Sequence, residues 1–176
     1  MTLHIPTLET ERLILRAQRV EDFEPFAAFL GSERARHTGG PVTNRLQAWR
    51  GFAHVAGQWL LRGYSSFVME AKATGEPIGL VGPWMPETWP EPEIGWSLWS
   101  AEAEGKGLAF EGARASLDYA FGALGWTTAV SYIERGNAGS IALAKRLGAV
   151  RDDAAAFPPD NEEPPLVYRH NAGGHA

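Results

Sequence analysis

The sequence contains no cysteine among its 176 residues. This absence excludes disulfide bonds, thiolate zinc sites and a cysteine nucleophile, and it suits a reducing compartment. No uninterrupted apolar run approaches the roughly 20 residues needed to cross a bilayer, and the first ten residues have no apolar signal core. We therefore expect a cytoplasmic protein with no membrane partner and no resident metal.

An excess of positive charge is also missing. Lys and Arg number 16 against 21 Asp and Glu, which gives a formal net charge of -5, unlike the basic stripe of a nucleic-acid-binding protein. A mildly acidic surface favours cationic small molecules or basic peptide ends. The length fits one domain that spans residues 1–176.

Strand-like and helix-like apolar patterns alternate along the chain. The patterns predict strands at 12–16, 64–70, 78–82, 93–99, 127–133, 149–151 and 166–169, and helices at 23–30, 44–61, 108–121 and 137–147. A Thr-Gly-Glu-Pro turn at 74–77 predicts a hairpin between the second and third strands. The order predicts an α/β sheet with helices on its faces.

The segment from Pro83 to Pro92 is rich in proline and tryptophan. Four prolines exclude a regular helix or a central strand at this point. Two interpretations stay open: a loop packed on its own tryptophans, or an aromatic wall beside a substrate pocket.

A glycine loop links a predicted strand to a predicted helix. The strand at 93–99 leads into Glu104-Gly105-Lys106-Gly107-Leu108-Ala109, and the helix follows. The first turn of a helix has unpaired N–H groups and a partial positive charge, and glycine lets the backbone approach a phosphate. A diphosphate is a chemically sensible ligand. The loop does not match a Walker sequence, because no Lys-Ser or Lys-Thr pair follows the glycines. It does not match the dinucleotide-binding fingerprint either, because the third glycine is missing.

A second constellation begins at Asn137 and Ser140, which open a helix after the strand at 129–133. Asn137 alone is typical of an N-cap, but the two constellations together are more specific. With residues 10–16, 93–96, 105–114, 118–121, 137–141 and 147–148, the chain resembles the GNAT superfamily of N-acetyltransferases. The resemblance is strongest to the branch that acetylates ribosomal-protein N-termini and related amines.

The resemblance implies a mixed, largely antiparallel central sheet with a splayed strand pair, helices on both faces, and acetyl-CoA as cofactor. Glu104 stands where the family has Gln or Arg, so we expect its carboxylate to point to solvent. The pantetheine would meet the backbone of Trp96 to Trp99, with the Leu98 N–H directed at the thioester carbonyl. The full set of expected cofactor-binding residues is Trp96, Leu98, Trp99, Gly105, Lys106, Gly107, Leu108, Ala109, Asn137 and Ser140.

The expected catalytic residues are Glu93 and Ser140. Placed on an apolar sheet face, Glu93 would have a pKa raised toward neutrality, which suits a general base; a structural carboxylate is the equally open alternative. The other candidate bases are Glu87, Glu91, His37 and His54. Many relatives have a tyrosine as general acid where this chain has Ala144, so Ser140 would serve instead, directly or through water.

The sequence leaves the acceptor open between a protein N-terminus and several classes of small amine. Tyr64 and Trp84 are the expected substrate-binding residues. The missing tyrosine and Glu104 keep open a non-catalytic acyl-CoA-binding sensor or interaction domain, and a binding protein for another phosphorylated ligand is a third interpretation. The tryptophan-rich segment is also a candidate contact for a homodimer.

Overall fold

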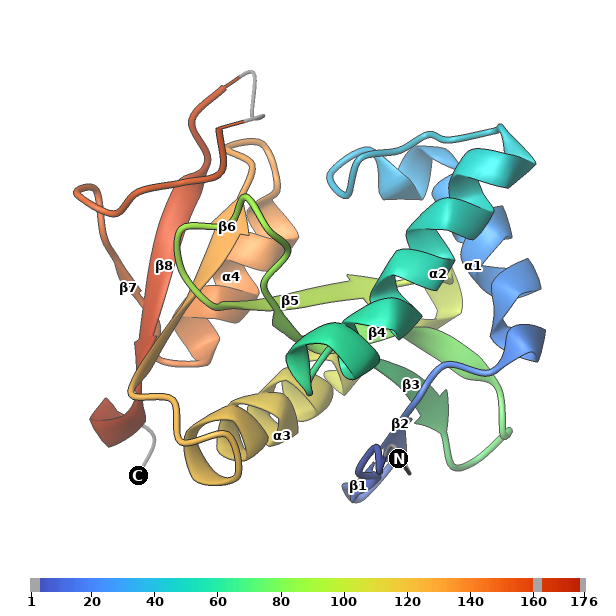
Figure 1. Cartoon of the computed structure of the whole chain (residues 1–176), viewed down its shortest axis with the longest axis horizontal. Helices are drawn as coiled ribbons and strands as arrows, with labels where there is room; N and C mark the ends of the chain where they lie inside the picture. Colours follow the sequence, from blue (N-terminus) through green and yellow to red (C-terminus); the bar gives the residue numbers. More distant parts are fainter. Residues whose placement is uncertain (1–3, 160–162, 175–176) are drawn as a thin grey trace.

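The sheet carries eight strands in the part of the chain that the computed structural model describes, residues 4–159 and 163–174 (Figure 1). The strand order is β1-β2-β3-β4-β5-β6-β8-β7. All neighbours pair antiparallel except β5 and β6, which are parallel. The strands are β1 Leu8–Glu9, β2 Leu13–Arg16, β3 Phe67–Ala71, β4 Pro77–Trp84, β5 Glu93–Leu98, β6 Thr128–Ile133, β7 Val150–Arg151 and β8 Leu166–Asn171.

The helices begin and end at residues suited to these places. Asn44 accepts from the Gln47 N–H at 3.0 Å before α2, and Asn137 accepts from the Ser140 N–H at 3.1 Å before α4. The helices are α1 Phe23–Leu30, α2 Arg45–Arg62, α3 Leu108–Gly122 and α4 Ala138–Arg146, with 3-10 turns η1 Val20–Asp22, η2 Glu33–Ala35, η3 Ala101–Ala103 and η4 Ala172–Gly174.

Helices cover both faces of the sheet, with α1 and α2 on one side and α3 and α4 on the other (Figure 1). Side chains alternate along each strand, so Val68 packs under α1 while Met69 packs under α3. Helix α3 lies very close to the sheet at Gly112, where an added Cβ would stand 2.8 Å from the Met69 sulfur. This contact, with Val81 of β4 at 3.2 Å, places the first turns of α3 directly on β3 and β4.

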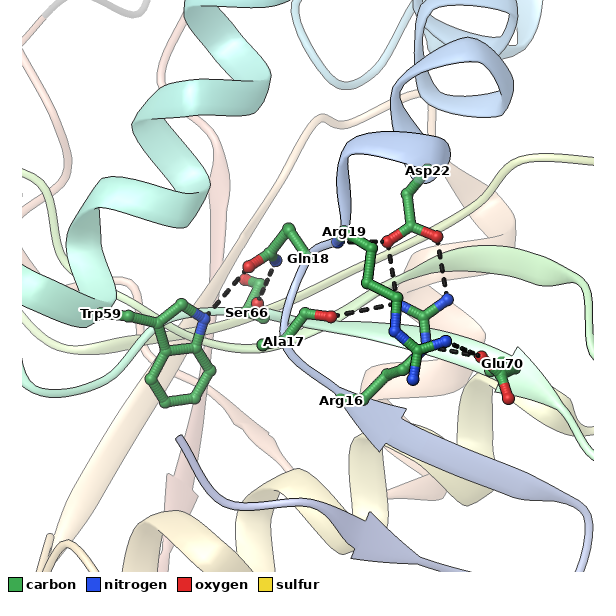
Figure 2. Close-up of polar contacts among 8 residues, drawn as sticks. All are labelled: Arg16, Ala17, Gln18, Arg19, Asp22, Trp59, Ser66 and Glu70. Carbon is green, nitrogen blue, oxygen red and sulfur yellow. Dashed lines mark hydrogen bonds and ion pairs between the residues drawn. The ribbon is translucent and has the colours of Figure 1, made fainter. Parts of the chain in front are cut away.

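A buried cluster of charged and polar side chains joins the first helical layer to the sheet (Figure 2). Arg16, at the end of β2, makes two 2.8 Å bonds to the carboxylate of Asp22 and one 2.5 Å bond to Glu70 on β3. Gln18 accepts from the indole N–H of Trp59 on α2 and donates to the carbonyl of Ser66. The cluster therefore fixes where α1 and α2 stand above the sheet.

The predicted helices and strands are confirmed, apart from their ends, and so is the predicted hairpin, which is formed by β3 and β4. One expectation is wrong: β4 continues through Pro83, which pairs with Ile94 of β5. Proline fits at this position because its ring nitrogen faces β3, and the pairing of β3 with β4 begins only at Phe67 and Val81. No hydrogen bond of the ladder is therefore lost. Trp49 of α2 lies on the apolar stripe of its helix but is 41% exposed. Within the described residues, the helices are all too short or too polar to cross a membrane.

Candidate active site

Strands β5 and β6 pair at a single position and then separate. Their register contains one pair, Glu93 with Val130, and the Val130 N–H donates to the Pro92 carbonyl at 2.9 Å. By contrast, β5 stays paired with β4 over its whole length. Beyond this vertex, the two arrows run apart in Figure 1. The structure thus contains the splayed strand pair that the resemblance implied.

The edge of β5 that faces the splay carries backbone groups of Trp96 and Leu98. The Trp99 N–H donates to the Ile78 carbonyl of β4 at 2.8 Å. Because backbone groups alternate in direction along an antiparallel strand, those of Trp96 and Leu98 are directed to the opposite edge. Trp99 itself is turned to β4 and its ring packs on Phe26, with centroids 5.8 Å apart. The expected set therefore divides: Trp96 and Leu98 face the splay, and Trp99 does not.

A side-chain bridge crosses the splay from β5 to α4. The indole N–H of Trp96 donates to the Ser140 hydroxyl at 3.1 Å, and the Ser140 N–H donates to the Asn137 side chain. The Ser140 hydroxyl accepts from Trp96 and so keeps its own proton for another partner. Ala144, in the place of the family's tyrosine, is fully buried. Three predicted site residues, Trp96, Asn137 and Ser140, are thus brought together.

Glu93 lies at the vertex of the splay. Its carboxylate accepts from the indole N–H of Trp89 at 2.5 Å and from the backbone N–H of Tyr132. Burial raises the pKa of Glu93 to about 7, and the two hydrogen bonds, which stabilise the charged form, offset part of the rise. A carboxyl group with this pKa can take up or release a proton at neutral pH.

Aromatic side chains surround Glu93 on the face of the sheet that carries α1 and α2. Trp84 is the β4 partner of Glu93 and stacks on His54 of α2, with ring centroids 5.0 Å apart. Trp89 meets Tyr132 of β6 edge to face at 6.4 Å. Burial raises the pKa of the Tyr132 hydroxyl, and the nearby carboxylates Glu91 and Glu93 raise it further. The tryptophan-rich segment thus packs against the carboxylate as a wall.

Tyr64 lies at the edge of this group. Its ring packs on Trp126, with centroids 5.1 Å apart, and its hydroxyl lies 3.7 Å from the Met85 sulfur, next to Trp84 in sequence. Burial raises the pKa of Tyr64. Of the two expected substrate-binding residues, Trp84 shares the face and the strand pairing of Glu93, whereas Tyr64 reaches only the beginning of the loop.

The other candidate bases have partners of their own. Glu91 forms a two-pronged ion pair with Arg169 at 2.7 and 2.9 Å. Glu87 is almost fully exposed and pairs with Arg62. His37 contacts Glu134 at 2.6 Å, and His54 contacts Gln58 at 2.8 Å. Among these groups, Glu93 alone combines the vertex of the splay with a pKa near neutrality.

The glycine loop forms the entrance to α3. Gly105 and Gly107 have φ of 71° and 76°, a region that disfavours other residues, and Gly107 caps α3. The Lys106 carbonyl accepts from Arg12 at 2.8 Å, and Arg12 also pairs with Glu111 in the first turn of α3 at 2.7 Å. Leu108 and Ala109 form the first helical positions. The loop is therefore held from both sides with its amides at the helix start.

Arg12 and Arg146 flank this loop, and the sequence predicted neither of them as a site residue. A Cβ added to Gly107 would lie 3.6 Å from Arg12 and 4.0 Å from Arg146, whose guanidinium stacks on Phe110 at 4.0 Å. Arg146 is the last residue of α4, and the Lys145-Arg146 pair was the only sequence signal for positive charge at this position. Glu104 pairs with Arg34 at 2.7 Å, in agreement with an outward-facing carboxylate. The donor set of amides and guanidiniums fits a diphosphate.

Comparison with known proteins agrees with this geometry. A model of the acetyltransferase (GNAT) domain family matches residues 12–150. An acetyltransferase from Agrobacterium tumefaciens str. C58 is 36% identical with a TM-score of 0.88, and the match covers 97% of each chain. A putative GNAT-family acetyltransferase from Bordetella pertussis is 25% identical with a TM-score of 0.78, over 94% of this chain and 99% of that one.

A more distant structure shares the fold alone. It is a putative ribosomal-protein-serine acetyltransferase from Vibrio cholerae, 19% identical with a TM-score of 0.78, over 97% of this chain and 99% of that chain. The family match covers most of the present sequence and includes β5, the glycine loop, β6 and α4. The chain belongs to the GNAT family of acetyltransferases, and acetyl-CoA is the donor of the group that it transfers.

Proposed function

We propose that this acetyltransferase acetylates a primary amine, on a small molecule or at a protein N-terminus, with Glu93 as general base. One observation carries the proposal: the carboxylate of Glu93 lies at the vertex of the splay, among aromatic side chains, with a pKa of about 7. An amine is largely protonated in neutral water and must lose a proton to become a nucleophile. A carboxylate with this pKa is suited to accept it.

The residues proposed to hold the cofactor come from the glycine loop, the two arginines beside it and β5. The amides of residues 105–109 and the guanidiniums of Arg12 and Arg146 would hold the pyrophosphate. The backbone of Trp96 and Leu98 would meet the pantetheine at the open edge of β5. Acetyl-CoA supplies a thioester carbonyl to be attacked. The Leu98 N–H is the proposed donor to the developing negative charge on that oxygen.

The proton of the amine and the departing sulfur each have a proposed partner. The indole N–H of Trp89 and the backbone N–H of Tyr132 stabilise Glu93 as an anion until it takes the proton of the amine. The Ser140 hydroxyl, which accepts from Trp96 and has its own proton free to donate, is the proposed hydrogen-bond donor to the departing thiolate. A thiolate is a fair leaving group near neutral pH, so the sulfur can leave without taking a proton from the protein.

The test is release of free thiol from acetyl-CoA with a panel of amines: N-terminal peptides, polyamines, amino acids and aminoglycosides. We expect turnover with one class, and a fall in kcat of about 100-fold in Glu93→Gln, the size typical of a lost general base. Glu87→Gln is the control, because Glu87 is an exposed carboxylate of the same segment; it should stay within about twofold of the wild type. Full activity of Glu93→Gln would remove Glu93 from the mechanism, and no release with any amine would remove the amine acceptor.

A further inference from the structure

The vertex of the splay shows an exchange of hydrogen-bond partners. In a parallel ladder that contains the Val130 N–H to Pro92 carbonyl bond, the next bond from β6 runs from the Tyr132 N–H to the Ile94 carbonyl. Neither group makes this bond. The Tyr132 N–H donates to the carboxylate of Glu93, and the Ile94 carbonyl accepts from the hydroxyl of Ser131 at 2.7 Å.

Ser131 is itself held in place from the other side. Its side chain is buried and its oxygen lies 3.0 Å from Nε2 of His170 on β8, which is fully buried. Because the hydroxyl proton goes to the Ile94 carbonyl, His170 must donate from Nε2, which fixes the tautomer of the ring. The rotation of the Ser131 hydroxyl is therefore determined by a chain from β8 through β6 to β5.

We infer that Ser131, oriented by His170, is a positioning residue that keeps the splay open and reserves the Tyr132 N–H for Glu93. The Ser131 hydroxyl donates to the Ile94 carbonyl, which would otherwise accept from the Tyr132 N–H and extend the ladder. Strands β5 and β6 therefore separate after the Glu93–Val130 pair rather than one residue pair later. The inference rests on the proposed role of Glu93 as base. It adds a residue that touches neither the acceptor nor the cofactor.

The test compares Ser131→Ala with Ser65→Ala. Ser65 is also buried and donates to a backbone carbonyl at 2.7 Å, that of Val55, away from the splay. In Ser131→Ala the Ile94 carbonyl loses its donor, the Tyr132 N–H turns to it, and Glu93 loses a hydrogen bond to its charged form. We expect the midpoint of the kcat/KM pH profile to rise by roughly one pH unit. We also expect KM for acetyl-CoA to rise severalfold, with a melting temperature like that of Ser65→Ala. Ser131→Thr, which keeps the hydroxyl, should restore the midpoint.

Other charged groups near Glu93 leave this comparison intact. They are Glu91 before β5, Arg169 on β8, Tyr132 on β6 and His54 on α2. Glu91 forms a two-pronged pair with Arg169, which also pairs with Asp152, and these contacts are the same in all the variants compared. His54 stacks on Trp84 and lies 2.8 Å from Gln58, so its surroundings are the same in all the variants compared.

A measurement on the unaltered protein decides the matter if Ser131→Ala does not fold. By NMR, the amide proton of Tyr132 should shift with a midpoint near pH 7, and no scalar coupling should join its nitrogen to the Ile94 carbonyl carbon. Observation of that coupling would overturn the inference, and so would a Ser131→Ala profile identical to that of Ser65→Ala. An inactive wild type with the expected Tyr132 shift would instead contradict the proposed function and leave the geometry of the vertex supported.

Discussion

At the scale of the residue, Glu93 links activity and stability to pH through one carboxyl group. Its pKa of about 7 in the folded chain lies above the value of about 4.3 for an unfolded glutamate. The folded state therefore holds the proton more tightly, and its stability falls as the pH rises through 7. Glu93→Gln removes this dependence. We expect the variant to gain up to about 3 kcal/mol relative to the wild type between pH 5 and pH 8.

Urea unfolding of both proteins at pH 5 and pH 8 measures this difference. Glu91→Gln is an informative comparison, because Glu91 forms a two-pronged pair with Arg169, and its loss leaves that arginine with Asp152 as its remaining carboxylate partner among the described residues. We expect Glu91→Gln to destabilise the protein at both pH values. Parallel pH dependences for the wild type and Glu93→Gln would contradict the raised pKa.

Single residues also mark the limit of what the sequence predicts about the site. Glu93 could be named because it begins a strand predicted to be central, and an apolar sheet face raises the pKa of a carboxyl group. Trp89 and Ser131 could not. The contact of Trp89 depends on the path of a proline-rich loop, and the bond of Ser131 depends on a ladder that stops after one pair.

At the scale of the element, the start of α3 depends on the backbone of Gly107. Its φ of 76° strains any other residue, and an added Cβ would also point at Arg12 and Arg146. We expect Gly107→Ala to weaken acetyl-CoA binding by about tenfold or more, since the strained φ at this position moves the backbone amides that are proposed to meet the pyrophosphate. Isothermal titration with acetyl-CoA measures the effect.

The matched control for this change is Gly63→Ala. Gly63 ends α2 with a φ of 78°, and an added Cβ there meets nothing within 4 Å. Both variants should lose about 1 kcal/mol of stability, the usual cost of a left-handed residue, whereas only Gly107→Ala should lose affinity. Equal affinities in the two variants would argue against the loop as the pyrophosphate site.

Elements differ in how far their sequences determine them. The helices were predictable because Asn44, Asn137, Gly31 and Gly63 mark their ends and the apolar spacing fills the interval. Leu46 and Leu60, two of the exposed apolar side chains of α2, follow the same spacing, so periodicity alone did not separate them from the core. Strand β4 ran past its predicted end because Pro83 stands where no neighbour needs its N–H.

At the scale of the whole molecule, the strand order carries the function. Only one neighbouring pair of the described sheet is parallel, and that pair is the one that opens. A hydrophobic pattern predicts that strands exist but not which neighbours they take, since every apolar face can be buried in several arrangements. The resemblance to a family supplied this order, and the register of Glu93 with Val130 then brought the candidate base to the vertex.

The two layers of the molecule are joined by the buried cluster of Arg16, Asp22 and Glu70 (Figure 2). Both hydrogen bonds of the Asp22 carboxylate to Arg16 are buried, and the carboxylate also accepts from the Arg19 N–H. Asp22→Asn leaves the buried guanidinium without its main counter-charge. We expect a loss of about 3–5 kcal/mol in the free energy of unfolding, the range for a broken buried pair.

Glu24→Gln is the control for this prediction, because Glu24 pairs with Arg45 on the same layer but at the surface. Exposed pairs contribute little to stability, so this variant should unfold close to the wild-type urea concentration. If Asp22→Asn folds, it should also lower kcat, since a looser first helical layer moves His54 of α2 away from Trp84, the β4 partner of Glu93. Equal unfolding midpoints for the two variants would show that the buried Asp22–Arg16 pair contributes no more to stability than the exposed Glu24–Arg45 pair. The buried pair would then not set the position of the first helical layer.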